Sequence, residues 1–233
     1  MITLNLKEFT KLQRIKVEGK RYYLIPDSTV AYPSATTVLS TFNKGSLDNW
    51  IKRVGEKEAN RQKNFAAGHG GDLHKMAEDF VLNRVPNKTK NPFAKVRFKP
   101  IGELLTRHVT EVYAVEPSLY SDKLKVAGSI DLVALFDDKV SVIDYKTSKR
   151  TKTLKDVHHY FMQASMYAAM IYERWGIKAE SLILIISCDD DIEHPTVLTQ
   201  PVGPWLKKTM EWIEQCDLKP VDTQQVEYEI EKD

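Results

Sequence analysis

The first part of the chain shows a hairpin pattern followed by helical spacing of its hydrophobic residues. Residues 12–25 form two short apolar runs with Gly19-Lys20 between them, which predicts a β-hairpin. A helix is expected after Pro33, because the Ser34 hydroxyl can accept a hydrogen bond from a free backbone N–H of the first turn. This region therefore predicts a hairpin and then a capped helix.

Two further helices are expected on either side of a glycine-rich segment. Residues 47–67 are rich in Lys, Glu, Arg and Ala and predict one helix. The segment 68–71 reads Gly-His-Gly-Gly and predicts the end of that helix, because glycine is a poor helix former. Asp72 can then cap a new helix that runs to about Leu82.

A basic segment follows these helices. Residues 84–99 carry six basic residues and no acid, and Pro86 and Pro92 predict a loop at its start. The segment is either a solvated connector or a surface for nucleic-acid phosphates, interleaved with Phe93 and Phe98. The sequence leaves both interpretations open.

Strand patterns dominate the second half of the chain. The segment 181–187 is apolar on both faces, as an interior strand of a covered sheet would be. Gly176 can end the helix before it. The order of elements predicts an α/β fold with a mixed sheet covered by helices on both sides. The predicted elements are strands at 111–120, 125–136 and 139–146, a helix at 156–175, the strand at 181–187, and a helix from Pro204 to about Cys216.

Length and composition are those of one soluble domain. The 233 residues suffice for a full core, and 42% hydrophobic and 28% charged residues exclude disordered, collagen-like and coiled-coil proteins. The longest aliphatic run, 182–186, is far shorter than a bilayer span, and the N-terminus lacks the apolar run of a signal peptide. We expect one domain over 1–233, with an N-terminal β-hairpin (1–31), a helical segment with a basic loop (32–110), a core of sheet and helices (111–217) and an acidic tail (218–233).

Charge and cysteine content reduce the range of possible functions further. The net charge of +2 does not by itself indicate a nucleic-acid-binding protein, but it conceals segregation, since residues 211–233 hold eight acids and two lysines. Two cysteines, Cys188 and Cys216, cannot build a disulfide framework or a four-thiolate iron–sulfur cluster. A phosphate-binding Gly-x4-Gly-Lys-[Ser/Thr] motif is absent, so we expect no ATP and no helicase motor.

The most informative chemistry lies in the stretch 126–147. If Asp137-Asp138 form a two-residue turn, Asp131 falls opposite Asp144; a turn shifted by one residue pairs Asp131 with Lys146 instead. In both registers Asp131, Asp144 and Lys146 share one face of the ribbon. An intermediate register would place the two acids on opposite faces.

Two aspartates that face each other destabilise a sheet unless a cation lies between them. Lys146 supplies one positive charge, but a divalent metal with oxygen ligands fits two carboxylates better. The alternative is a polar stripe on the solvent side of an antiparallel hairpin. Two other pairs are four residues apart on predicted helices, and each alone is a weak indication of a site: His74 with Glu78, and Gln163 with Tyr167.

Taken in order, these motifs resemble those of the RecB-like branch of the PD-(D/E)xK nucleases. Within that branch the chain is similar to the mitochondrial genome maintenance exonucleases and related phage nucleases, from about Tyr32 to the last helix. The resemblance implies a restriction-endonuclease-like fold, with a mixed central β-sheet flanked by helices and an N-terminal helical segment. The residues that carry it are Gly68-x5-His74-x3-Glu78, Gly128-x2-Asp131, Asp144-Tyr-Lys146-Thr and Gln163-x3-Tyr167, with Tyr32-Pro-Ser-Ala-Thr-Thr-Val-Leu39 and Val142–Ser148 as supporting text.

The resemblance also implies roles for these residues. His74, Asp131 and Asp144, with the backbone carbonyl of Tyr145, would bind Mg²⁺ or Mn²⁺, and an imidazole ligand favours Mn²⁺. Lys146 would hold or activate the attacking water and stabilise charge on the phosphate. The remaining residues are accessory: Gln163 and Tyr167 would contact the nucleic acid or brace the metal ligands, Glu78 would bind a second metal or brace its helix, and Glu116 would support the site.

The implied activity is that of a metal-dependent DNA exonuclease acting on single-stranded ends, in DNA replication, recombination, repair or phage DNA processing. The implied location is the cytoplasm, that of the host for a viral protein, with an organelle also open, and no membrane partner is expected. The alternatives are a structure- or sequence-specific endonuclease on the same fold, and a non-catalytic DNA-binding module. Trp50 and Phe65 would stack on bases, or be core residues of an ordinary helix. DNA-binding cations are expected at Lys52, Arg53, Arg61, Lys149 and Arg150.

Overall fold

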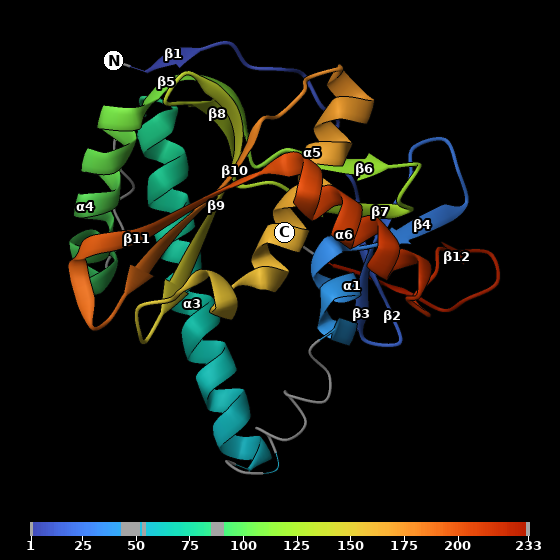
Figure 1. Cartoon of the computed structure of the whole chain (residues 1–233). Helices are drawn as coiled ribbons and strands as arrows, with labels where there is room; N and C mark the ends of the chain where they lie inside the picture. Colours follow the sequence, from blue (N-terminus) through green and yellow to red (C-terminus); the bar gives the residue numbers. More distant parts are fainter. Residues whose placement is uncertain (1, 43–51, 53–54, 85–90, 232–233) are drawn as a thin grey trace.

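A mixed six-stranded sheet forms the centre of the protein (Figure 1). The structure is a computed structural model that describes residues 2–42, 52, 55–84 and 91–231. In spatial order the strands are β1 (Thr3–Leu4), β5 (Val109–Val115), β8 (Leu132–Phe136), β9 (Lys139–Ser148), β10 (Ser181–Cys188) and β11 (Asp191–Pro201). The pairs β1–β5 and β9–β10 are parallel and the other pairs are antiparallel, so the predicted mixed sheet is confirmed.

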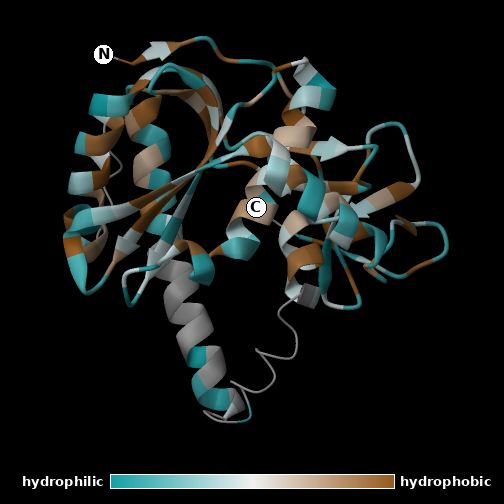
Figure 2. Cartoon of the chain, viewed as in Figure 1, coloured by the Kyte–Doolittle hydropathy of each residue, from teal (hydrophilic) through white to brown (hydrophobic). Residues whose placement is uncertain are grey.

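Helices cover both faces of this sheet, as the sequence predicts. Alternate residues of β10 separate the two sides, because Ile183 packs with the hydrophobic cluster on one face and Leu184 with the cluster on the other. Figure 2 shows hydrophobic residues on the strands and on the parts of the helices that pack against them. One face carries α3 (Glu56–Val81) and α4 (Pro92–His108); the other carries α1 (Ala35–Phe42), α5 (His158–Trp175) and α6 (Val202–Glu214), with a short 3₁₀ helix, η1 (Leu154–Asp156), before α5.

A second sheet combines strands from the N-terminal and C-terminal parts of the chain. Its strands are β12 (Val221–Asp222), β4 (Val30–Pro33), β3 (Lys20–Leu24), β2 (Arg14–Val17) and β13 (Glu229–Ile230), and a separate ribbon pairs β6 (Ser118–Ser121) with β7 (Val126–Ser129). The β2–β3 hairpin is the predicted one. The acidic C-terminal segment differs from the expected tail, since it adds an edge strand at each side of this sheet. Opposite charges favour that docking: Glu231 accepts a hydrogen bond from Arg21 at 2.8 Å and lies 3.3 Å from Lys16.

Local signals at helix ends are confirmed. The Ser34 Oγ accepts a hydrogen bond from the Thr37 N–H at 3.0 Å, as expected of a cap on α1. Gly176 has a φ of 67° and donates its N–H to the Tyr172 carbonyl at 2.9 Å, which ends α5. Both signals depend only on residues close in sequence, and this is why the sequence predicts them well.

The predicted break at 68–71 is wrong. α3 runs without interruption from Glu56 to Val81 across the glycines, and its first half projects beyond the body of the protein (Figure 1). Glycine weakens a helix without forbidding it, and the packing of Leu73 and later residues into the core stabilises the second half. Asp72 therefore does not cap a helix; its Oδ2 accepts a hydrogen bond from Asn91 Nδ2 at 2.9 Å.

Two predicted strands are each divided in two. The segment 111–120 splits into β5 and β6 at Glu116, whose φ of 50° lies in the left-handed region, and 125–136 splits into β7 and β8 at Asp131. The two breaks lie side by side, because the Glu116 N–H donates to the Asp131 carbonyl at 3.2 Å. Glu116 and Asp131 therefore lie at the two positions where the strands are interrupted.

The hydrophobic pattern does not predict β11, an edge strand with exposed or half-exposed residues throughout and Pro195 in its interior. Some predicted features lie outside the described residues, including Trp50, Arg53 and the start of the basic loop at 85–90. Within the described part of the chain, none of the helices combines the length and the apolar character needed to cross a membrane.

The continuous course of α3 predicts the effect of a glycine substitution. Gly71 is exposed, and a Cβ added there would meet open space. We expect Gly71→Ala to raise the free energy of unfolding by about 0.5–1 kcal/mol, because alanine is the better helix former. The control is Gly176→Ala, which should lower it by about 1 kcal/mol because φ there is 67°. Urea unfolding of both variants measures this, and destabilisation by Gly71→Ala would contradict a continuous helix.

Candidate active site

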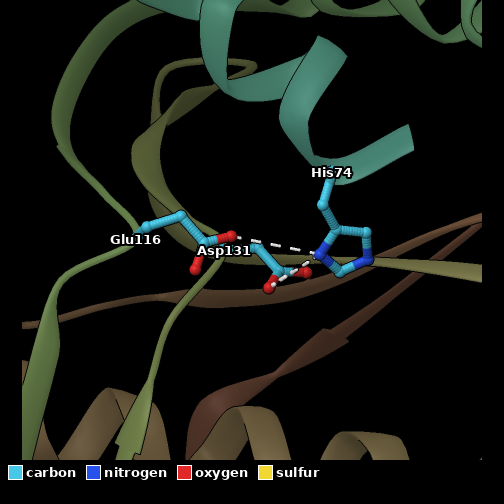
Figure 3. A group of neighbouring side chains, drawn as sticks. All are labelled: His74, Glu116 and Asp131. Carbon is cyan, nitrogen blue, oxygen red and sulfur yellow. Dashed lines mark ion pairs between the residues drawn. The ribbon is translucent and has the colours of Figure 1, made fainter. Parts of the chain in front are cut away.

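Three side chains from three parts of the fold converge beside the sheet (Figure 3). His74 comes from α3, Glu116 follows β5 and Asp131 precedes β8. The His74 Nδ1 lies 3.4 Å from Asp131 Oδ1 and 4.0 Å from Glu116 Oε1. One potential metal-ligand atom from each residue lies within 4.8 Å of the others, and within the described ranges these residues form the one group of this kind.

The β8–β9 register brings Asp131 next to the start of the Asp144-Tyr145-Lys146 segment of β9. Phe136 pairs with Lys139 and Leu132 with Ile143, around a turn in which Asp137 and Asp138 have φ angles of 49° and 61°. Positive φ at both turn residues is typical of a type I′ hairpin. The first predicted register is therefore confirmed, and the shifted ones are excluded.

The backbone of Tyr145 connects the acid to the imidazole. Its N–H donates to Asp131 Oδ2 at 2.7 Å, and its carbonyl oxygen lies 3.0 Å from His74 Nε2. The Tyr145 ring is buried on the α3 side of the sheet, with its centroid 5.9 Å from that of His74. The Tyr145 carbonyl and His74, both expected from the motifs to be metal ligands, thus lie side by side.

The second motif acid, Asp144, is not one of the three grouped residues. Asp144 is buried, with 2% of its side chain exposed, and its Oδ2 lies 2.5 Å from Lys146 Nζ. The alternation of β9 places both of these side chains on the α5 side, where Val142 also packs. The structure therefore joins Asp144 to Lys146, and His74 to Asp131 and Glu116.

Burial and mutual charge shift the pKa values of these groups. Burial raises the pKa of Asp144 to about 6, against the opposing effect of Lys146. Burial and the Asp131 charge raise the pKa of Glu116 to about 7. Burial alone would lower the pKa of His74, but Asp131 outweighs it and raises the value to about 9. Burial opposes ionisation of Asp131, yet His74 and Lys146 hold its pKa below the usual range.

The sequence profile of one family matches most of the chain, over residues 31–226. The chain belongs to the PD-(D/E)XK nuclease superfamily. This confirms the family expected from the motifs, and with it the restriction-endonuclease-like α/β fold.

Curated relatives match shorter segments, and the chain spans 8 to 38% of their lengths. One subunit of the ATP-dependent helicase/nuclease of Streptococcus equi subsp. zooepidemicus is 27% identical over 100 residues, which are 40% of this chain and 8% of that protein. A Methanosarcina barkeri protein assigned as tRNA pseudouridine synthase D is 30% identical over 115 residues, 47% of this chain and 26% of that one. Mitochondrial genome maintenance exonuclease 1 of Xenopus tropicalis is 24% identical over 130 residues, 54% of this chain and 38% of that one.

The accessory motif of this PD-(D/E)XK protein is held together inside the core. Gln163 Nε2 donates to the Tyr167 hydroxyl at 2.7 Å, and both side chains are buried on α5. The Tyr167 ring fills the space beside Gly128, where an added Cβ would lie 2.6 Å from the ring. The glycine of the Gly128-x2-Asp131 motif therefore makes room for the tyrosine of the other motif.

Other predicted residues lie outside the cluster. Glu78 shares the helix of His74, but its carboxylate lies 2.8 Å from Lys75 Nζ and 3.1 Å from an Arg84 nitrogen. Arg61 pairs with Glu58 at 2.8 Å on the exposed surface of α3. The remaining predicted cations, Lys52, Lys149 and Arg150, are exposed.

The sequence indicates only a supporting role for Glu116, and it does not indicate two residues next to the site, Ser129 and Tyr160. Glu116 belongs to the three-residue group itself, where Ser129 Oγ donates to its Oε2 at 3.0 Å. The Tyr160 ring faces Lys146, with 5.0 Å between the ammonium and the ring centroid. Tyr160 precedes Gln163 by three residues, so the helical period was a usable signal for it.

The donor set fits a hard divalent cation. Glu116 and Asp131 offer carboxylate oxygens, which Mg²⁺ and Mn²⁺ prefer, and the His74 Nδ1 that faces them offers a nitrogen, which favours Mn²⁺. Within the described part of the chain, the buried Asp144 Oδ2 has one partner, the Lys146 ammonium 2.5 Å away. A further oxygen donor is therefore available close to the group.

This electrostatic arrangement predicts proton release on metal binding. With a pKa of about 9, His74 carries a proton at neutral pH and must lose it to bind a metal. We expect the Mn²⁺ affinity to rise roughly tenfold per pH unit between about pH 7 and 8. Isothermal titration calorimetry in buffers of different ionisation enthalpy measures the Mn²⁺ affinity and the number of protons released. In the control His74→Gln the slope should decrease, and a wild-type affinity independent of pH would contradict the assignment.

Proposed function

We propose that the chain is a metal-dependent deoxyribonuclease that hydrolyses phosphodiester bonds as an exonuclease at single-stranded DNA ends. The observation that carries this proposal is the convergence of His74, Glu116 and Asp131 beside the buried Asp144–Lys146 pair. Membership in a nuclease superfamily supports the same chemistry. DNA replication, recombination, repair or phage DNA processing are the processes in which such an activity would serve.

His74, Asp131, Asp144 and the Tyr145 carbonyl would hold Mg²⁺ or Mn²⁺, with Glu116 as a further ligand. A bound divalent ion supplies polarisation of the phosphodiester and a lowered pKa of bound water. The protein fixes these donors through packed elements: the Tyr145 backbone binds both Asp131 and His74, and β9 holds Asp144 in the core. The donors therefore need little reorganisation when the substrate arrives.

Lys146 is placed to act on the phosphate or on the water. Its side chain is 20% exposed, so the ammonium is largely desolvated but can still reach a substrate at the surface. An ammonium in such a position can donate hydrogen bonds to the attacking water and to phosphate oxygens on which negative charge develops. Burial of the site increases the strength of these interactions.

Exposed cationic side chains after β9 and on the first half of α3 suit a nucleic-acid backbone. Lys149 and Arg150 are exposed directly after β9, in a loop whose Thr151 N–H donates to Asp190 at 2.9 Å. Lys52 is exposed, and Arg61 is exposed on the first half of α3, which projects from the body (Figure 1). Phosphate contacts of this kind hold a strand without reading its sequence. The proposed preference for single-stranded DNA rests on the resemblance of the sequence motifs to those of the exonucleases.

The mechanism predicts which substitutions abolish cleavage. We expect Asp131→Asn, Asp144→Asn and Lys146→Met each to lower the cleavage rate by roughly 10³-fold, because each removes a metal ligand or a group that stabilises the transition state. Asp138→Asn, in the exposed hairpin turn, is the matched control and should leave the rate unchanged. The assay uses labelled DNA with Mn²⁺, and circular dichroism verifies folding. Full activity in excess EDTA, or an unimpaired Lys146→Met protein, would rule the mechanism out.

Exonuclease action predicts a dependence on DNA ends. Linear single-stranded DNA should be degraded, and a covalently closed single-stranded circle of the same sequence should stay intact, because it offers no end. End-labelled linear duplex DNA, tested with Mg²⁺, Mn²⁺ or no metal, measures the strand preference in the same experiment. Cleavage of the circle at a rate comparable with the linear strand would favour an endonuclease, and binding without cleavage would indicate a DNA-binding module.

A further inference from the structure

The Lys146 ammonium contacts two different groups. The Asp144 carboxylate lies 2.5 Å away on the same strand, and the Tyr160 ring centroid lies 5.0 Å away on the first turn of α5. An ammonium within about 6 Å of an aromatic centroid, over the ring face, is attracted by the ring quadrupole. This attraction is stronger where water is excluded, and only 20% of the Lys146 side chain is exposed.

The two contacts differ in what happens when a cation binds. In the proposed function the Asp144 carboxylate is a metal ligand, so its negative charge is shared with the ion and its attraction for Lys146 decreases. A positive ion nearby also repels the ammonium. A tyrosine ring is not a ligand for hard divalent cations, which take oxygen donors, so the Tyr160 contact remains in place.

The ring itself is fixed by its surroundings. Tyr160 packs against the hydrophobic cluster on the α5 side, and its backbone N–H donates to the Val157 carbonyl at 2.9 Å. The His159 ring lies against it, with 4.0 Å between the centroids. Tyr160, Gln163 and Tyr167 are spaced i, i+3 and i+7, so one face of α5 carries all three. The helix face that bears the accessory pair therefore also presents the Tyr160 ring to Lys146.

We propose that Tyr160 is a positioning residue for catalysis, whose ring face keeps the Lys146 ammonium directed at the reacting phosphate when Asp144 is engaged by a metal ion. The inference rests on the proposed function for its catalytic consequence. The contact itself belongs to the protein without metal and can be measured separately.

Steady-state kinetics on end-labelled single-stranded DNA tests the role. Tyr160→Phe keeps the ring and should retain kcat within about twofold, whereas Tyr160→Leu and Tyr160→Met should lower kcat by about 3- to 30-fold with KM within about twofold. The matched control is Tyr172→Leu, an exposed tyrosine on the same helix, which should behave as the wild type. Equal losses in Tyr160→Phe and Tyr160→Leu, or a loss confined to KM, would overturn the proposal.

A double-mutant cycle on metal-free protein gives a readout independent of cleavage. Lys146→Met, Tyr160→Leu and the double variant are unfolded in urea, and we expect the unfolding constant of the double variant to differ by about threefold or more from the product of the single effects. Additive effects would overturn the proposed contact. A wild-type protein that cleaves no DNA would overturn the nuclease proposal and the catalytic role together, while the cycle would still report on the contact. An active wild type with a fully active Tyr160→Leu would overturn the present inference alone.

Discussion

Burial of negative charge at the start of β8 and in the interior of β9 is the constraint on which the site depends. Asp131 directly precedes β8 and Asp144 lies within β9, next to the Leu132–Ile143 pair, and both carboxylates are largely removed from water. A buried carboxylate is costly unless a positive group accompanies it. His74 accompanies Asp131 and Lys146 accompanies Asp144, so the metal-free site is held by two internal cations. The need to supply them explains why separate elements meet at one place.

Backbone atoms contribute as much to this arrangement as side chains do. Tyr145 binds Asp131 through its N–H and His74 through its carbonyl, while its ring packs into the core on the α3 side. The position of the site is therefore coupled to the packing of the whole sheet. On the other face, Tyr167 and Tyr160 lie on one side of α5 and contact Gly128 and Lys146 respectively. Helices on both faces of the sheet therefore contact residues of the candidate site.

The parts of the fold that sequence predicts are those with local causes. The hairpin register follows from the Asp137-Asp138 turn, and the end of α5 follows from Gly176, because each depends on backbone angles at one or two residues. The continuous α3 across 68–71 and the C-terminal edge strands depend on contacts with distant segments, and the sequence did not reveal them. The motif spacing identified most of the candidate site. The central place of Glu116 required the two strand breaks, which only the tertiary structure shows.

Anomalous diffraction from crystals soaked in Mn²⁺ tests most directly whether these buried donors form a metal centre. We expect a peak at the manganese absorption edge at about 2.0–2.6 Å from ligand atoms of His74, Asp131 and Asp144, beside Glu116, with Lys146 moved away from Asp144. A peak confined to exposed acids such as Asp191, with the His74–Asp131 pair unchanged, would contradict it.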